Sequence, residues 1–246
     1  SQVVAVPAGQ EKTVTLQAEW PKPRLWSPQD PHLYTLVVGA RTGVLGDSLE
    51  VRFGFREFWV EGDRFFLNGV PTHLLAAAAM PMPQYDADPG RAYEIAESAD
   101  CSALALRGQP RSRRWYEAAD EAGLLLVAGS GLYHLGSSYA LTRDEFWTNA
   151  RNHLTSLVKQ RRNHPSVVVW SAADELLASG GAKAAGVEQK AGALADLVRS
   201  LDPTRPVMFD GDADPAGKAD IISLHRPRAF APVSYTHLTL PTKRIV

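Results

Sequence analysis

The residues best placed to do chemistry are two neighbouring acids, Asp174 and Glu175. They follow residues 166–170, a run of β-branched and aromatic side chains that is typical of a strand buried on both faces. In a barrel of alternating strands and helices, residues at the carboxyl ends of the strands carry the chemistry, while the opposite rim carries stability. The position of Glu175 therefore predicts a catalytic acid or base.

Polar residues also follow other predicted strands. Three of them are Arg107 at the end of residues 102–107, Asp210 at the end of residues 207–210, and His225 directly after residues 221–224. Because the carboxyl ends of parallel strands meet at one rim, we expect these side chains to lie near Glu175. For Arg107, a structural or solvated role is an equally good interpretation.

The elements that must position these residues alternate along the chain. Helical patterns cover residues 89–99, 112–123, 142–162 and 187–201, with Thr142 predicted as a cap followed by Glu145 three residues later. Strand patterns cover residues 70–79, 102–107, 124–128, 166–170, 207–210 and 221–224. This alternation predicts a parallel α/β barrel of about six strands.

The first 57 residues have a different pattern. Alternating apolar and polar residues at 12–18, 33–39 and 48–55 predict short strands separated by turn residues, and residues 58–69 predict a hairpin. Several short strands at such spacing are typical of part of a β-sandwich. A β-rich segment is thus expected to precede the barrel.

Composition excludes several classes of partner. The chain has 246 residues, 45% of them hydrophobic and 22% charged, which suits a globular protein with a sizeable core. A net charge of −1 provides no basic surface for nucleic acid or for an anionic membrane. No apolar run reaches membrane-spanning length and no signal peptide opens the chain, which leaves the compartment and the oligomeric state open.

No cofactor or metal site is predicted. The single Cys101 excludes an internal disulfide and a cysteine metal cluster. Asp210, Asp212 and Asp214 lie close together in sequence, but they lack the glutamate that completes a calcium-loop signature.

Two stretches carry a family resemblance. RNHPSVVVW followed by S-x-x-Asp-Glu resembles the fourth barrel strand of glycoside hydrolase family 2, which includes β-galactosidases, β-glucuronidases and β-mannosidases. PRLWSPQDPHLYTL followed by RFGFRE resembles the immunoglobulin-like domain of the same family and its exit into the barrel. The resemblance implies a partial immunoglobulin-like sandwich at residues 1–57 and a truncated TIM barrel at residues 58–233.

The resemblance also implies roles for the site residues in cleavage of a carbohydrate substrate. Glu175 stands at the position of the acid/base, and Asp174 stands where the family has a substrate-binding asparagine. His225, Arg107 and Asp210 are expected to bind substrate. One departure is that an ionised Asp174 can only accept hydrogen bonds, whereas an asparagine also donates them.

The family's catalytic nucleophile is a glutamate after the seventh strand, and this chain offers no matching residue. Residues 234–246 fit neither of the last two strands and resemble a recurrent non-native tail. A retaining glycosidase needs two carboxylates about 5 to 5.5 Å apart. We therefore expect a glycosidase in the parent protein, an inactive fragment in this chain, and open sheet edges that favour association.

Two other classes of function stay open. Small residues at 76–79 and Gly129-Ser130 replace the polar strand ends common in the family, which favours a non-catalytic carbohydrate-binding or scaffolding protein on a degenerate barrel. A barrel enzyme acting on phosphorylated metabolites is the weaker alternative, because its phosphate site follows strands seven and eight.

Overall fold

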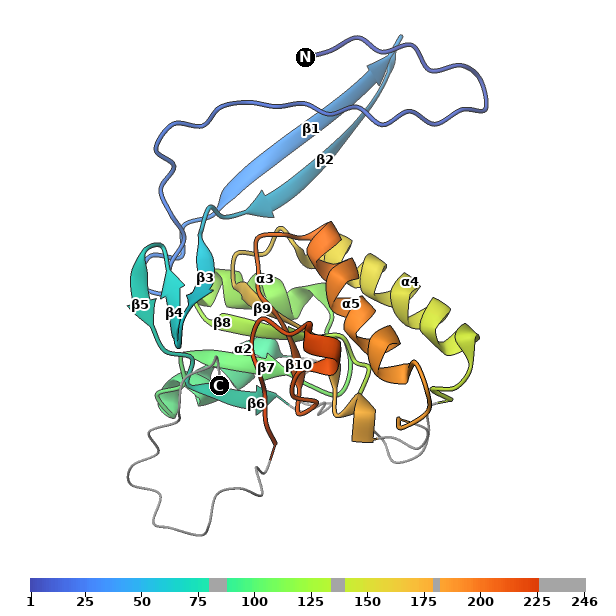
Figure 1. Ribbon diagram of the computed structural model, residues 1–246. Helices are drawn as coiled ribbons and strands as arrows, with labels where there is room; N and C mark the ends of the chain where they lie inside the picture. The colour runs from blue at the N-terminus through green and yellow to red at the C-terminus, as the bar shows by residue number, and fades with distance from the viewer. Residues whose placement is uncertain (80–87, 134–139, 179–181, 226–246) are drawn as a thin grey trace.

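The centre of the protein is a parallel β-sheet with helices packed on one face (Figure 1). The computed structural model describes residues 1–79, 88–133, 140–178 and 182–225. The sheet has the order β10-β9-β8-β7-β6, so each strand lies beside the next one along the chain. Its strands are β6 (Ala76–Ala79), β7 (Ala103–Leu106), β8 (Leu125–Gly129), β9 (Val167–Asp174) and β10 (Val207–Asp210). This arrangement confirms the predicted parallel α/β architecture.

The helices that link these strands match the predicted ones closely. They are α2 (Pro89–Ser98), α3 (Arg113–Ala122), α4 (Asp144–Arg161) and α5 (Val187–Leu201), with the short 3₁₀ turns η1 (Leu176–Ala178) and η2 (Pro215–Gly217). Gly123 ends α3 in the left-handed conformation that favours glycine, as predicted. None of the described helices combines the length and apolar character needed to cross a membrane.

Strand β9 is the most deeply buried element, because all eight of its residues are covered. Trp170 packs in the core between sheet and helices, whereas Val168 packs in a second core on the other face of the sheet. The amino end of the strand is anchored by the buried Asp120, which accepts hydrogen bonds from Ser166 and lies 2.6 Å from His164 Nδ1. The position of β9 in the sheet is thus determined from both faces and from its start.

A small antiparallel sheet covers the face of the parallel sheet that lacks helices. It consists of β3 (Phe58–Glu61), β4 (Arg64–Leu67) and β5 (Val70–Thr72). Phe58 and Phe65 stack on each other and pack with Trp26 in the second core. Trp26 is fully buried and its indole N–H donates to the carbonyl of Asp120, which ties the first part of the chain to helix α3.

The first part of the chain contains a two-stranded antiparallel ribbon, β1 (Tyr34–Thr42) and β2 (Leu45–Phe53). These strands confirm two of the three predicted there. The third prediction is wrong, because residues 12–18 are exposed and form no strand. Alternation indicates a strand only where a neighbour accepts its backbone hydrogen bonds, and this segment has no ladder partner among the described residues.

Three other predicted elements differ in detail. Residues 70–79 were expected to be one strand, but they form β5 and β6, which belong to different sheets. Residues 221–224 were expected to form a sixth strand, but they make only isolated β-bridges. One of these is a parallel bridge between Met208 and Ile221. The residue before α4 is Arg143 and makes no side-chain cap, so the predicted cap at Thr142 is wrong. The residues at which a helix or strand begins and ends depend on tertiary contacts, which local sequence patterns do not contain.

We predict that the ribbon promotes association in solution. The residues Leu36, Val38 and Leu49 share one face, because Leu36 pairs with Val51 and Val38 pairs with Leu49, and they are 51%, 44% and 63% exposed. Both edges of the ribbon are also unpaired within the described residues.

Replacing Leu49 with Lys should raise the monomeric fraction measured by size-exclusion chromatography with light scattering. Val37→Lys on the opposite face, beside Glu50, is the matched control and should have less effect. An equal effect of both substitutions would argue against association through this face.

Candidate active site

The five residues singled out from the sequence lie together at the carboxyl ends of the parallel strands. Arg107 follows β7, Asp174 ends β9 with Glu175 directly after it, and Asp210 ends β10. His225 lies after the bridges at residues 221–223 and contacts both Glu175 and Asp210. The expectation that these side chains share one rim is therefore met.

Arg107 binds two carboxylates at this rim. Its Nε and Nη2 donate to the two oxygens of Asp174 at 2.8 and 2.5 Å, and its Nε lies 3.2 Å from Asp210 Oδ2. The bidentate bond to Asp174 raises the pKa of Arg107, so the guanidinium is charged at every accessible pH. Burial raises the pKa of Asp174, and the bond from Arg107 opposes that rise. The pair is thus best described as an ion pair held partly out of water.

His225 lies between two carboxylates. Its Nδ1 is 2.8 Å from Glu175 Oε1, and its Nε2 is 2.7 Å from Asp210 Oδ1. Burial by itself would lower the pKa of His225, but the bonds to Glu175 and Asp210 outweigh it and raise the pKa. The imidazole therefore links the proposed acid to the carboxylate at the end of the next strand.

The backbone around Glu175 is shaped for this contact. Glu175 has a φ of 49°, a left-handed conformation that costs a non-glycine residue free energy, and its N–H donates to the carbonyl of Asp210 at 2.7 Å. Gly211 also has a positive φ, and a Cβ atom there would lie 2.6 Å from His225 Nδ1 and 2.8 Å from Glu175 Cγ. Only glycine leaves room for His225 and Glu175 to meet.

Sequence reasoning missed three contributors to this site. Ser223 donates to Asp210 Oδ1 at 3.0 Å, and Gly211 provides the space just described. Asp212 was weighed only as a metal ligand, but it accepts hydrogen bonds from the backbone N–H groups of Leu176 and Leu177 at 2.7 and 2.9 Å. A glycine between two aspartates at a strand end was the available signal for close packing.

The acidic residues near β10 do not act as one ligand set, because each has a different internal partner. Asp210 contacts His225, Asp212 caps η1, and Asp214 accepts from the N–H of Ala219. One atom each from Asp174, Glu175 and His225 lies within 4.8 Å of the others. Asp174 is paired with Arg107, and the imidazole of His225 bridges Glu175 and Asp210, so each of these groups has a partner within the chain.

Two other strand ends at this rim carry little polar chemistry. Strand β6 consists of four alanines, Ala76–Ala79, so it has no polar side chain at its end, as predicted. At the end of β8, a Cβ atom on Gly129 would lie 2.1 Å from the carbonyl oxygen of Leu106, so backbone contact excludes a larger residue there. Ser130 is buried, and its carbonyl lies 2.6 Å from His153 Nε2, so this histidine has a hydrogen-bond partner within the fold.

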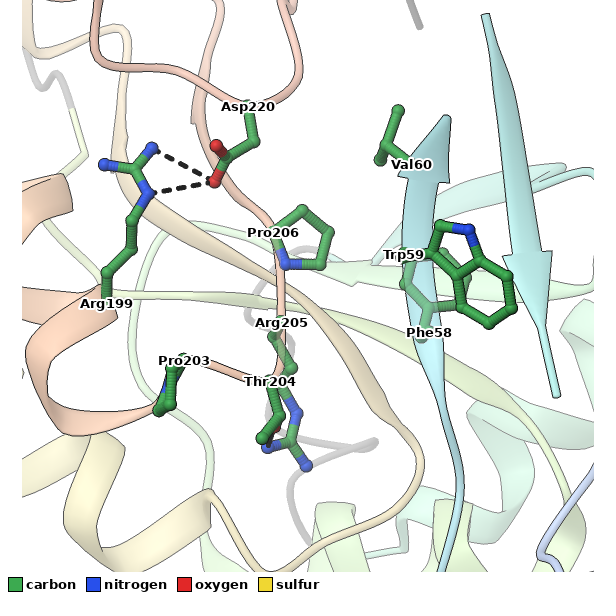
Figure 2. A pocket seen from close by; sticks show the side chains of 9 residues that line it. All are labelled: Phe58, Trp59, Val60, Arg199, Pro203, Thr204, Arg205, Pro206 and Asp220. Carbon is green, nitrogen blue, oxygen red and sulfur yellow. Dashed lines mark hydrogen bonds and ion pairs between the residues drawn. The ribbon is translucent and has the colours of Figure 1, made fainter. Parts of the chain in front are cut away.

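A hollow of about 340 Å³ lies at the opposite rim of the sheet, where the strands begin. Figure 2 shows Arg199 and Asp220 paired on one side and the aromatic side chains of Phe58 and Trp59 on the other. The carboxylate of Asp220 also accepts from the N–H of Val207, at the start of β10. Because its charged groups are paired and it is remote from the strand ends that carry Glu175, we do not place the site there.

The chain matches two family descriptions. "Glycosyl hydrolases family 2, TIM barrel domain" matches residues 51–233, and "Glycosyl hydrolases family 2" matches residues 1–56. Among solved structures, the chain is similar to apo β-glucuronidase 3 of Bacteroides uniformis, with 28% identity and a TM-score of 0.63 over 76% of this chain and 25% of that one.

Two other solved structures have the same fold. A glycosyl hydrolase family 2 member of Bacteroides cellulosilyticus DSM 14838 shows 26% identity and a TM-score of 0.65, covering 81% of this chain and 28% of that one. The galacturonate-bound β-galacturonidase of Eisenbergiella tayi shows 22% identity and a TM-score of 0.66, covering 78% and 35%. The chain thus spans about a quarter to a third of the length of these proteins.

We predict that Arg107 is required for stability. Arg107→Leu leaves Asp174, whose side chain is only 8% exposed, without its bidentate partner. Removing one member of a buried ion pair should lower the free energy of unfolding by about 3 kcal/mol, measured by urea denaturation. Arg24→Leu, which breaks the exposed pair with Asp30, is the control and should leave stability near that of the wild type. Equal losses in the two variants would contradict a buried role for the Arg107 pair.

A second prediction concerns pH. Burial raises the pKa of Asp212 from 3.8 to about 6, although two backbone N–H groups favour its charged form. Because the folded state binds this proton more tightly than the unfolded chain, the protonated carboxyl favours the fold at low pH. This contribution is fully present below the pKa of the unfolded chain, near 4, and is lost as the pH rises through the folded-state pKa of about 6. Between pH 4 and 7 the wild type should therefore lose about 2 kcal/mol of unfolding free energy relative to Asp212→Asn.

Denaturation at several pH values measures this difference, with Asp63→Asn in an exposed turn as the control. Parallel pH profiles for the wild type and Asp212→Asn would show that Asp212 does not titrate in this range.

Proposed function

The chain belongs to glycosyl hydrolase family 2, and on that basis we propose that it supplies the acid/base half of a site that hydrolyses O-glycosyl bonds. The observation that carries the proposal is the placement of Glu175 directly after β9, hydrogen-bonded to His225 at the carboxyl rim of the sheet. In this role Glu175 protonates the leaving oxygen and then activates water.

The reaction we propose is a retaining cleavage of a β-linked sugar. Such a mechanism needs a nucleophilic carboxylate about 5 to 5.5 Å from the acid/base. Among the described residues, the nearby carboxylates of Asp174, Asp210 and Asp212 are each bound to an arginine, a histidine or backbone N–H groups. We therefore propose that this chain by itself does not complete the catalytic cycle.

The other site residues receive supporting roles in this proposal. Asp174 and Arg107 form one wall of the site as an ion pair. The carboxylate of Asp174 accepts a hydrogen bond from a sugar hydroxyl. Asp210 contacts the sugar less directly, since His225, Ser223 and Arg107 occupy it. Two of the similar solved structures are a β-glucuronidase and a β-galacturonidase, so β-glucuronides and β-galacturonides are the first substrates to test.

The domain organisation proposed with this function has an immunoglobulin-like part at residues 1–57 and a barrel part at residues 58–233. Within the described residues, the ribbon of β1 and β2 belongs to the first part and the five parallel strands to the second. Residues 226–246, including the predicted non-native tail 234–246, lie outside the described residues.

A second candidate is a carbohydrate-binding protein without catalysis. It is favoured by the alanines of β6 and by Gly129, which leave two strand ends without side chains that can bind a sugar hydroxyl. It is opposed by the contacts around Glu175, which a passive binding surface does not need.

External nucleophiles provide the sharpest test of the proposed function. Azide can replace a missing carboxylate nucleophile, so the chain should release phenol from phenyl β-glycosides only when azide is added, and the product should be an α-glycosyl azide. Phenol is a poor leaving group and needs an acid, whereas 2,4-dinitrophenol does not. Glu175→Gln should therefore reduce rescue about 100-fold or more on the phenyl glycosides and far less on the dinitrophenyl glycosides.

Glu61→Gln, at an exposed glutamate of β3, is the matched control and should leave rescue unchanged. If calorimetry detects sugar binding but azide gives no product, the binding-only function is correct. Equal losses on the two leaving groups in Glu175→Gln would remove Glu175 from the role of acid.

A further inference from the structure

The roles expected for His225 change once its contacts are counted. A histidine ring has two nitrogens, and each can make one in-plane hydrogen bond. In this chain Nδ1 faces Glu175 Oε1 at 2.8 Å and Nε2 faces Asp210 Oδ1 at 2.7 Å. A sugar hydroxyl could bind this ring only by displacing one of the two carboxylates. Direct substrate binding is therefore a poor description of what His225 does.

Counting protons leads further. An ionised carboxylate only accepts hydrogen bonds, and a neutral imidazole donates from one nitrogen and accepts at the other. With a carboxylate on each side, both bonds form only if the imidazole carries two protons, or if it is neutral and one carboxyl is protonated. In either case the group of Glu175, His225 and Asp210 holds one proton more than its fully deprotonated form, and its net charge is −1.

We propose that His225, held by Asp210, is a positioning residue that orients Glu175 and keeps this proton beside it. The transfer is simple: the Nδ1–H bond of His225 breaks as an O–H bond forms on Glu175. An imidazolium and a carboxylate become a neutral imidazole and a neutral carboxyl. The Nε2–H of His225 remains hydrogen-bonded to Asp210 throughout. The use of this proton as the catalytic acid rests on the function proposed above.

The surroundings are built to hold the three groups together. Ser223 donates to Asp210 Oδ1, the same oxygen that faces His225, and the N–H of Gly211 lies 3.3 Å from Ser223 Oγ. The missing side chain at Gly211 leaves the space in which His225 and Glu175 meet. The side chains of His225 and Asp210 are 24% and 12% exposed, so water competes little for their bonds.

Charged groups from three strands act on the ring. Among the described residues, Glu175 and Asp174 come from the end of β9 and Asp210 from β10, and all three favour a protonated imidazole. Arg107, at the end of β7, acts in the opposite direction. Since Arg107 is already bound to Asp174 and Asp210, the carboxylates dominate and the pKa of His225 is raised.

The test observes the ring directly and does not depend on sugar hydrolysis. Long-range ¹H–¹⁵N spectra of the ¹⁵N-histidine-labelled chain distinguish doubly protonated rings from neutral tautomers, and His225→Gln assigns the signal among the seven histidines. We expect His225 to titrate with a midpoint above its ordinary value of 6.5, and both of its nitrogens to be protonated below that midpoint. Glu175→Gln and Asp210→Asn should each lower this midpoint by about one pH unit or more.

Two controls separate this effect from misfolding. Glu61→Gln makes the same chemical change on the surface of β3 and should leave the His225 midpoint unchanged. The signal of His153, which contacts the Ser130 carbonyl, should be unaltered in every variant and reports that the fold is intact. As a second variant, Gly211→Ala should lower the midpoint by separating His225 from Glu175.

The inference is overturned if the titration midpoint of His225 in the wild type is 6.5 or lower, or if Glu175→Gln leaves that midpoint in place. This outcome is independent of the azide experiment. Normal titration shifts without azide rescue would support the proton-holding group and reject the glycosidase function, whereas rescue without the shifts would do the reverse.

Discussion

Pairing of buried charge is the constraint on which the site depends. The ends of two strands, β9 and β10, bring the carboxylates of Asp174, Glu175 and Asp210 to one rim, where they are largely removed from water. Unpaired, such charges would repel each other and oppose folding. Arg107 and His225 resolve this problem with four bonds that each cross from one strand end to another. Stability and reactivity at this rim therefore depend on the same contacts.

The hydrophobic core makes this arrangement possible by leaving the strands little freedom to shift. Strand β9 is buried on both faces, and its start is tied to Asp120 by Ser166 and His164. The register between β9 and β10 then places Asp174 and Glu175 beside Asp210. A shift in pairing by one residue would turn each side chain to the other face. The packing of the core thus determines which groups can meet at the rim.

The departure from the family pattern at Asp174 has a physical explanation in this chain. An asparagine can hold its neighbours without charge, whereas an aspartate at the same place needs a cation. Arg107 supplies it with a bidentate bond across 67 residues of sequence. Asp174 and Arg107 therefore act as a pair, and a change at either residue alters the charge at this rim. At the end of β8, the small residue Gly129 is required because the carbonyl of Leu106 leaves no room for a side chain.

Local sequence predicted the alternation of strands and helices in the parallel sheet and the position of Glu175 after its strand, while the family came from the resemblance of two motifs. The physical reason is that apolar periodicity, glycine at helix ends and strand-end position are properties of neighbouring residues. The bounds of α5 and β10 were predicted correctly for this reason. The same local signals misassigned residues 12–18, because a strand also needs a partner that alternation does not reveal.

Only the tertiary structure decided which polar groups are bonded to one another. His225 and Glu175 are 50 residues apart, and their contact depends on strand order, register and the missing side chain of Gly211. The sequence therefore specified which strand-end residues can do chemistry, and the fold determined their charges and partners, because electrostatic energy depends on distance and burial in space.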